Sequence, residues 1–324
     1  MIQVLKKLLL PLQRPIDMAL SVLVIPAAYI LLGYRRFGSA RLPITTKRLK
    51  KIGVFPIRNH YYEPLFDDSS LTIPPPNDRI LPGVDLNTHG QLEFLRTLTY
   101  SHELVDLKLD NKANGKHNFQ FGNGGFESGD AEYLYQIIRA IKPSKVFEIG
   151  SGDSTKIANL ALQKNALETG KNARHVCVEP YEMPWLESFG NIEVVRKRIE
   201  DCDFDWAKEL IAGDILFIDS SHVIRPQGDV LKEYLEILPR LATGVYVHVH
   251  DIFTPKDYPR SWIVENVKFW NEQYLLEALL SNTGRYEIIG ALNYLKSKYF
   301  SELQKVCPYL TKEREPGSFY IRIR

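Results

Sequence analysis

The stretch VFEIGSGDST, residues 146–155, decides the fold of this 324-residue chain. An apolar run typical of a β-strand ends around Glu148, turns through Gly150 and Gly152, and continues into a helical pattern at 156–162. A strand, a glycine-rich turn and a helix in this order predict the first unit of a Rossmann-like sheet, where a nucleotide-type cofactor binds. Because glycine has no Cβ atom, both glycines allow a tight turn and a close backbone approach to a ligand.

Apolar runs and helical patterns alternate through the rest of the chain. We expect strands at 145–150, 174–179, 192–196, 214–219, 244–250, 286–291 and 317–323. We expect helices at 130–142, 154–164, 228–240 and 264–281. This alternation predicts an α/β fold, a Rossmann-like seven-stranded and mostly parallel sheet with helices on both faces. The last run alternates with period two, which predicts a reversed final strand, either at an edge or antiparallel to its neighbour.

The chain divides into three parts by composition. Residues 1–52 form a basic, partly apolar N-terminal arm, and residues 121–324 carry the cofactor-binding pattern. Between them, residues 53–120 are irregular and rich in Pro, Asp, Asn and aromatic side chains. We expect this middle segment to wrap around the cofactor-binding domain rather than fold alone. Its polar and aromatic side chains either line a substrate pocket or staple the segment to the surface.

Residues 16–32 are mostly apolar, and basic residues flank them on both sides. Three interpretations stay open for this stretch. It is an interfacial helix or helical hairpin on an anionic membrane, a helix packed on the protein itself, or a true membrane span. The absence of a small-residue cleavage site after it argues against a signal peptide. If it spans, the excess of basic residues after Leu32 places the body of the protein in the cytoplasm.

Overall composition narrows the class of protein. A hydrophobic content of 44% and a charged content of 25% are ordinary for a globular protein with a core. The net charge of +2 gives no case for a nucleic-acid partner. Cys177, Cys202 and Cys307 have no metal-ligand spacing, so we expect reduced, structural thiols. Together these features predict a cytoplasmic protein, with the arm allowing contact with the inner face of a membrane.

The choice of cofactor depends on the turn itself. A dinucleotide fingerprint has a third glycine, but Thr155 stands at that position. The carboxylate of Glu148 would repel a pyrophosphate, whereas it suits an amino-bearing or cationic ligand. Glu179 ends the second strand and can accept hydrogen bonds from both hydroxyls of a ribose. These features favour S-adenosylmethionine over NAD. The alternatives are an NAD(P)-dependent oxidoreductase and an inactive, membrane-tethered binding protein with this fold.

The run EIGSG at 148–152 resembles the first motif of class I S-adenosylmethionine-dependent methyltransferases, and Glu179 matches their ribose-binding acid. Within that class the chain looks similar to a bacterial group that includes sugar O-methyltransferases, of the rhamnosyl or macrolide-sugar kind, and cephalosporin hydroxylase-like proteins. The resemblance implies that Glu148 and the turn face the methionine moiety, and that adenine packs near the loop after Glu179. The candidate cofactor-binding residues are Glu148, Gly150, Ser151, Gly152, Ser154, Glu179 and Asp219.

Polar side chains also follow the fourth and fifth predicted strands. Asp219 and His222 come after the fourth, and His250 and Asp251 end the fifth. We expect His222, His250 and Asp251 to be catalytic, because methyl transfer to a hydroxyl needs alignment and a deprotonated oxygen. Either a histidine removes the proton as a general base or a divalent cation lowers the pKa of the hydroxyl.

The mechanism with a divalent cation resembles that of the catechol-type and macrolide-sugar O-methyltransferases. That resemblance implies Asp219, His250 and Asp251 as the ligands of a divalent cation, magnesium or manganese. The family pattern has a carboxylate where this chain has His250, and magnesium prefers oxygen ligands, so the imidazole favours manganese or a metal-free mechanism. A carbohydrate or glycolipid-like acceptor is expected. The loop 253–262 has the length and aromatic content of a substrate lid, and Trp262 and Trp270 offer faces on which a sugar can stack.

Overall fold

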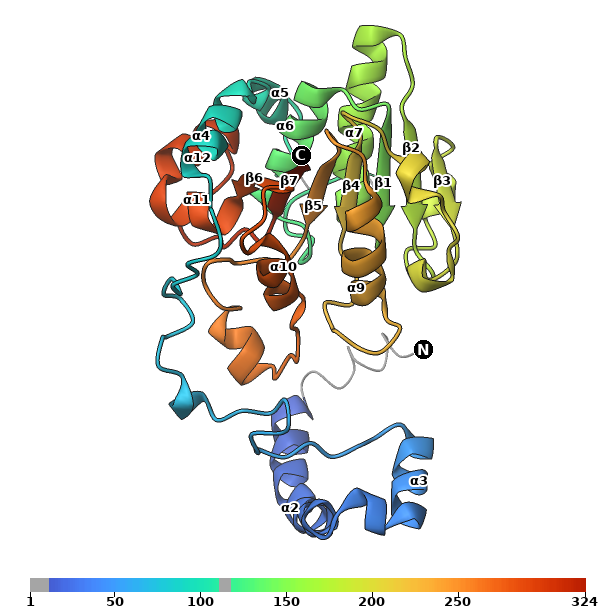
Figure 1. The fold of residues 1–324 in the computed structure, drawn as a ribbon, viewed down its shortest axis with the longest axis vertical. Helices are drawn as coiled ribbons and strands as arrows, with labels where there is room; N and C mark the ends of the chain where they lie inside the picture. The colour runs from blue at the N-terminus through green and yellow to red at the C-terminus, as the bar shows by residue number, and fades with distance from the viewer. Residues whose placement is uncertain (1–11, 111–117) are drawn as a thin grey trace. The chain divides into compact units, whose positions relative to one another are not determined.

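The computed structural model describes residues 12–110 and 118–324 (Figure 1). Parts of two predicted segments, residues 1–11 of the arm and 111–117 of the middle segment, lie outside the described residues. Contacts divide the chain into two compact units between Thr72 and Ile73. The first part of the predicted middle segment therefore groups with the arm, and the part from Ile73 onward groups with the α/β domain.

The first unit contains a long apolar helix and a short basic one. Helix α2 is Gln13–Phe37 and helix α3 is Pro43–Ile52. Tyr34 is the buried residue of α2, and its hydroxyl lies 2.5 Å from Oγ1 of Thr46 in α3. Arg35 forms an ion pair with Glu63 at 2.7 Å, and its guanidinium lies 4.9 Å from the ring centre of Phe55. These contacts hold the C-terminal turn of α2 within its unit.

The second unit is built on the predicted seven-stranded sheet, in the order β3-β2-β1-β4-β5-β7-β6. Strands β1 to β5 run parallel, and β7 pairs antiparallel with both β5 and β6. The strands are β1 Lys145–Ile149, β2 Arg174–Val178, β3 Ile192–Val195, β4 Ile215–Ile218, β5 Tyr246–Val249, β6 Tyr286–Ala291 and β7 Phe319–Ile323. The mostly parallel sheet and its reversed last strand are confirmed. The edge position allowed for the last strand is wrong, because β7 lies between β5 and β6.

Both faces of the sheet are covered, because the parallel strands are apolar on both sides. On β1, Val146 packs into one core with α6 and α7, while Phe147 and Ile149 pack into a second core. The second core includes Trp206, Tyr234 and Leu276 from segments on the opposite face. The helices of this unit are α4 Thr88–Thr97, α5 Ser101–Asp106, α6 Asp130–Ile141, α7 Asp153–Thr169, α8 Trp206–Glu209, α9 Asp229–Lys232, α10 Glu272–Leu280, α11 Leu292–Lys298 and α12 Phe300–Val306.

Two predicted helices differ from the structure. The pattern at 228–240 is α9 continued by a π-helical segment, Glu233–Ile237, and a 3₁₀ turn, Leu238–Arg240. The single helix expected at 264–281 is wrong, since α10 begins only at Glu272. A π-helical segment, Ser261–Glu265, comes before it. At the start of α10 the backbone N–H groups of Asn271 and Glu272 donate to the carbonyl of His222, in the loop after β4. This contact with a distant loop sets the first residue of α10.

The segment expected to be irregular contributes α4 and α5 to the α/β unit. The side chain of Asn87 donates to the carbonyl of Ile288 at 2.9 Å, and the backbone N–H of Ala291 donates to Gln91 at 2.7 Å. Both contacts attach α4 to the edge strand β6. In Figure 1, α4 lies with α11 and α12 at the β6 end of the sheet. Residues 73–110 thus belong to the α/β unit and are partly helical.

Candidate active site

The glycine turn after β1 is fixed first by a contact within the protein. Gly150 has φ +79°, and a Cβ atom placed on it would lie 1.9 Å from the carbonyl oxygen of Asp219. The backbone of β4 therefore excludes any side chain at this position, before a ligand is considered. Gly152 differs, because a Cβ there would meet the Met183 side chain at an ordinary 3.7 Å. The sequence pattern explains Gly150 by the close approach of a ligand, whereas the passage of the Asp219 carbonyl already requires a glycine here.

Glu148 lies beneath the turn and is fully buried. One carboxylate oxygen accepts from Oγ1 of Thr155 at 2.8 Å and from Oγ of Ser154 at 3.3 Å. The other lies 2.5 Å from Nε2 of His175 on β2. Glu148 and Ser154 thus brace the turn from below and are not among the residues that line the cavity above it. His175 could not be recognised from sequence, because a lone histidine in a strand becomes informative only once the neighbouring strand is known.

A cavity of about 690 Å³ opens above the turn at the carboxyl ends of β1, β2 and β4. Its lining includes Gly150, Glu179, Asp219 and Arg225. Glu179 accepts hydrogen bonds from the backbone N–H groups of Ser151 at 3.3 Å and Tyr181 at 3.0 Å. The carboxylate is thereby held at the cavity wall, at the place expected for a group that binds ribose hydroxyls.

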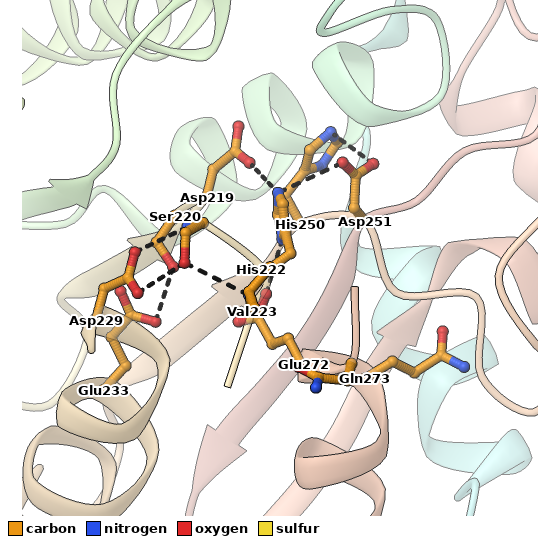
Figure 2. Close-up of polar contacts among 12 residues, drawn as sticks. Asp219, Ser220, His222, Val223, Asp229, Glu233, His250, Asp251, Glu272 and Gln273 are labelled. Atoms are coloured by element: carbon orange, nitrogen blue, oxygen red, sulfur yellow. Dashed lines mark hydrogen bonds and ion pairs between the residues drawn. The ribbon is translucent and has the colours of Figure 1, made fainter. Parts of the chain in front are cut away.

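The side chains after β4 and β5 converge beside this cavity (Figure 2). Nε2 of His222 lies 3.3 Å from Oδ1 of Asp219 and 3.6 Å from Oδ2 of Asp251. One donor atom from each of the three residues falls within 4.8 Å of the other two, a spacing that suits a metal ion. Burial raises the pKa of Asp219, but the charges of His250 and His222 outweigh it and lower that pKa to about 2.

His222 is oriented from its other ring nitrogen by a residue that we did not predict. Nδ1 of His222 lies 2.8 Å from Oε2 of Glu272, the first residue of α10, and Tyr234 donates to Oε1 of the same carboxylate at 2.9 Å. Burial lowers the pKa of His222, but the hydrogen bonds to Asp219 and Glu272 raise it well above its usual value. From sequence, Glu272 falls in the middle of the helix expected at 264–281, where an acid gives no indication of a role in a site.

His250 lies behind the cluster of Asp219, His222 and Asp251. Its Nε2 is 3.5 Å from Oδ1 of Asp251, and its ring centre is 5.0 Å from that of Phe126. Burial lowers the pKa of His250, and the charges of Asp251 and Asp219 more than compensate and raise it. The structure therefore groups the two aspartates with His222, whereas the expected metal set contained His250 in that place.

Two tryptophans and a lysine lie next to His222. The ring of Trp270 is 4.2 Å from that of His222, and Trp262 packs edge-on against Trp270 at 5.1 Å. The ammonium of Lys268 lies 3.6 Å from the ring centre of Trp270 and 4.1 Å from that of Trp262. Trp262, Lys268 and Trp270 are all partly exposed. They form an aromatic and cationic wall beside the cluster.

The sheet, the glycine turn and the acids at the strand ends have the arrangement of a methyltransferase domain. Residues 147–252, from β1 to the loop after β5, match the family model described as a methyltransferase domain. The match supports S-adenosylmethionine as the cofactor of this segment and goes against the NAD(P)-dependent alternative.

The similarity to individual proteins is weaker than the match to the family model. The chain is 28% identical over 137 residues to an uncharacterised protein of Archaeoglobus fulgidus, an overlap of 41% of this chain and 61% of that protein. The chain thus spans about three-fifths of the length of the curated relative.

Two solved structures overlap with part of the chain. One is a Plasmodium falciparum methyltransferase of the protein-L-isoaspartate type in complex with S-adenosyl-L-homocysteine, at 13% identity and a TM-score of 0.28, covering 49% of this chain and 83% of that one. The other is an antibiotic-related methyltransferase, at 16% identity and a TM-score of 0.27, covering 58% of this chain and 92% of that one.

Proposed function

We propose that this protein transfers a methyl group from S-adenosylmethionine to a hydroxyl oxygen of a carbohydrate or glycolipid-like acceptor. The observation that carries the proposal is the position of Asp219, His222 and Asp251 beside the cavity that Gly150 and Glu179 line. The bound cofactor supplies an electrophilic methyl group on a sulfonium. The protein has to align the acceptor oxygen with that methyl group and remove its proton.

The cavity suits a cofactor that carries ribose and no phosphate. The Glu179 carboxylate lines it and would accept hydrogen bonds from the ribose hydroxyls, which are worth about 1.5–3 kcal/mol each when the acceptor is charged. The backbone N–H of Ser151 already donates to Glu179, so the turn and the acid move as one unit. The loop from Pro180 to Glu182 closes the side where adenine would pack.

The arrangement around His222 favours a cation-assisted reaction over a simple general base. Burial lowers the pKa of His222, but the hydrogen bonds to Asp219 and Glu272 raise it well above its usual value, which disfavours the neutral ring that a general base needs. A divalent cation held by Asp219 and Asp251 would displace the proton from Nε2 of His222 and take that nitrogen as its third ligand. Glu272 would then accept the Nδ1 proton, the usual outer partner of a metal-bound histidine. Such a cation lowers the pKa of a bound hydroxyl.

The mixed ligand set also bears on the identity of the cation. Two carboxylates and an imidazole suit manganese better than magnesium, because magnesium prefers oxygen ligands alone. His250 would not bind the cation itself. Its Nε2 lies 3.5 Å from Oδ1 of Asp251 and would limit the rotation of that carboxylate.

The acceptor class rests on the wall formed by Trp262, Lys268 and Trp270. Tryptophan faces stack against the C–H faces of sugars, and a neighbouring ammonium can donate to hydroxyl or acidic groups. Trp270 contacts the ring of His222, so an acceptor stacked on this wall would lie close to the aspartate pair.

The test is calorimetric titration of the full chain with S-adenosylhomocysteine, with and without manganese. We expect micromolar binding without metal, and manganese binding that disappears in Asp219→Asn. Transfer of labelled methyl groups to a panel of methyl glycosides and bacterial glycolipids then tests the acceptor. Absence of S-adenosylhomocysteine binding to folded protein would remove the proposal. Binding with methyl transfer to small amines or proteins, but to none of the saccharides, would remove the acceptor class alone.

A further inference from the structure

We propose that helix α2 inserts into a lipid bilayer and anchors the protein at an anionic membrane surface. Every residue from 12 to 30 is exposed, although residues 18–34 carry no charge. Among the described residues, α2 is the helix with the length and hydropathy of a membrane span, at a mean hydropathy of 2.0. No part of that window is buried, so α2 differs from the core helix of a globular protein, which passes the same test while mostly buried.

The distribution of apolar side chains indicates insertion rather than adsorption. Val22, Leu23, Val24 and Ile25 follow one another and are each more than half exposed. Because successive residues of an α-helix are about 100° apart, four in a row cover its whole circumference. An interfacial helix needs a polar face turned to water, and this part of α2 has none. A helix that is apolar on all sides is stable inside the bilayer.

The charges at its two ends give α2 an orientation. Seven arginines and lysines lie within residues 35–51, after the uncharged part of the helix, and three lie within residues 1–15, before it. Four of the seven belong to α3, and the contact between Tyr34 and Thr46 holds α3 beside the C-terminal turn of α2. The denser basic cluster therefore lies at one end of the apolar helix. Anionic headgroups attract such a cluster, and the positive side of a span faces the cytoplasm.

The length of the uncharged part fits a bilayer with small adjustments. Residues 18–34 are about 25 Å long as a helix, against about 30 Å for a typical hydrocarbon core. The long, exposed side chain of Arg36 can reach the headgroups from within the boundary, and the bilayer can thin locally. Pro26 lies inside α2, a position that membrane helices tolerate. The methyltransferase domain would then work at the cytoplasmic face, where lipid-linked acceptors are accessible.

The experiment is flotation of the purified full chain with vesicles of phosphatidylcholine, alone or mixed with phosphatidylglycerol. We expect the protein to float with both, more completely with phosphatidylglycerol, and to stay with the vesicles in alkaline carbonate. Leu23→Asp should lower the partition coefficient onto phosphatidylcholine vesicles about a hundredfold, since a carboxylate at the centre of a span is strongly unfavourable. The matched control is Leu167→Asp, a leucine of α7 that is 84% exposed, and it should float as the unchanged protein does.

A second variant separates the basic cluster from the apolar helix. Lys47→Glu, Arg48→Glu, Lys50→Glu and Lys51→Glu combined should remove the preference for phosphatidylglycerol and leave binding to phosphatidylcholine intact. Circular dichroism and thermal unfolding of each variant report whether the α/β unit is still folded. Release by carbonate, failure of the folded full chain to float, or flotation of Leu23→Asp would each overturn insertion. An alkaline phosphatase works only outside the cytoplasm, so its fusion after Arg324 should be inactive in cells. An active fusion would overturn the orientation.

Discussion

Nε2 of His222 lies 3.6 Å from Oδ2 of Asp251, and both residues have left-handed backbone conformations, with φ of +60° and +58°. Such conformations are uncommon outside glycine and concentrate at functional sites. Here they turn the chain at the ends of β4 and β5 so that the two side chains face each other. The strain is located where the proposed cation and acceptor would meet.

The first prediction concerns Asp251. Asp251→Asn retains the shape and tolerates the left-handed backbone, but it removes the charge that faces His222. We expect methyl transfer to fall at least a hundredfold while affinity for S-adenosylhomocysteine changes less than about threefold. The matched control is Asp257→Asn in the following loop, where Asp257 pairs with Arg79. Normal rates in Asp251→Asn would show that the chemistry is located elsewhere.

Glu272 is predicted to act through His222. Glu272→Gln keeps the size of the side chain and weakens the charge-assisted hydrogen bond to Nδ1, so manganese affinity should fall about 10- to 100-fold. Cofactor affinity should stay unchanged, because Glu272 does not line the cavity. Glu277→Gln on the same helix is the control, since Glu277 is bonded to Thr254 and Arg79. Equal manganese binding in both variants would contradict the role of Glu272.

The two glycines of the turn should respond differently to alanine. At Gly150 the new Cβ would overlap the carbonyl of Asp219 and sit on a backbone of φ +79°, so we expect a loss of at least about 2 kcal/mol in the free energy of unfolding. Cofactor binding should be lost with it. Gly152→Ala has room beside Met183 and should cost less than about 1 kcal/mol. Denaturant unfolding of both variants measures the difference.

Glu132 in α6 should make stability depend on pH. It is fully buried, and burial raises its pKa to about 7, although it accepts hydrogen bonds from the N–H groups of Tyr309 and Gly129. The folded state therefore keeps a proton that the unfolded chain releases near pH 4.5. This contribution to stability is complete below about pH 4.5 and is lost as the pH rises toward 7.

The size of that loss follows from the shift between the two pKa values. It amounts to about 3 kcal/mol for this group. Glu132→Gln cannot ionise, so its unfolding free energy relative to the unchanged protein should improve by that amount between pH 4.5 and pH 8. Urea unfolding across this range is the measurement, and parallel pH curves for the two proteins would contradict the assignment.

Trp262 should affect recognition of the acceptor more than the rate of the chemical step. Trp262→Ala removes one face of the wall around Lys268, and we expect KM for a saccharide acceptor to rise about 3- to 10-fold with kcat little changed. Trp262→Phe keeps an aromatic face and should restore most of the affinity. A fall in kcat at constant KM would place Trp262 in the positioning of His222 instead.

The sheet could be predicted from sequence because most of its strands are short apolar runs that are buried on both faces. The strand β1 shows this, since its residues Val146, Phe147 and Ile149 are apolar on both faces of the sheet. Such an apolar run can be recognised in the sequence before the neighbouring strands are known. The order of strands also brings Asp219 and Asp251 to one edge, because parallel strands share the direction in which they end.

The contacts that complete the site could not be predicted in the same way. His175 and Glu272 lie 27 and 50 residues from their partners, Glu148 and His222, and neither forms a local motif with its partner. The start of α10 has the same origin, because it depends on the carbonyl of His222 rather than on local helix propensity. The local sequence pattern predicts a single helix that spans residues 264–281. The hydrogen bonds to the carbonyl of His222 override this preference and start the helix at Glu272.

The place of β7 sets an order of events during synthesis. β7 fills the gap between β5 and β6, and just before it the carbonyl of Gly317 accepts from the N–H of Ile252, next to Asp251. A ribosome therefore has to release residues up to about Ile323 before β5 is paired on both sides and the loop of Asp251 is held. The cofactor-binding half, from β1 to β4, emerges more than a hundred residues earlier. A nascent chain can thus form the cofactor pocket while it still lacks a working catalytic edge, and truncated products would be inert toward acceptors.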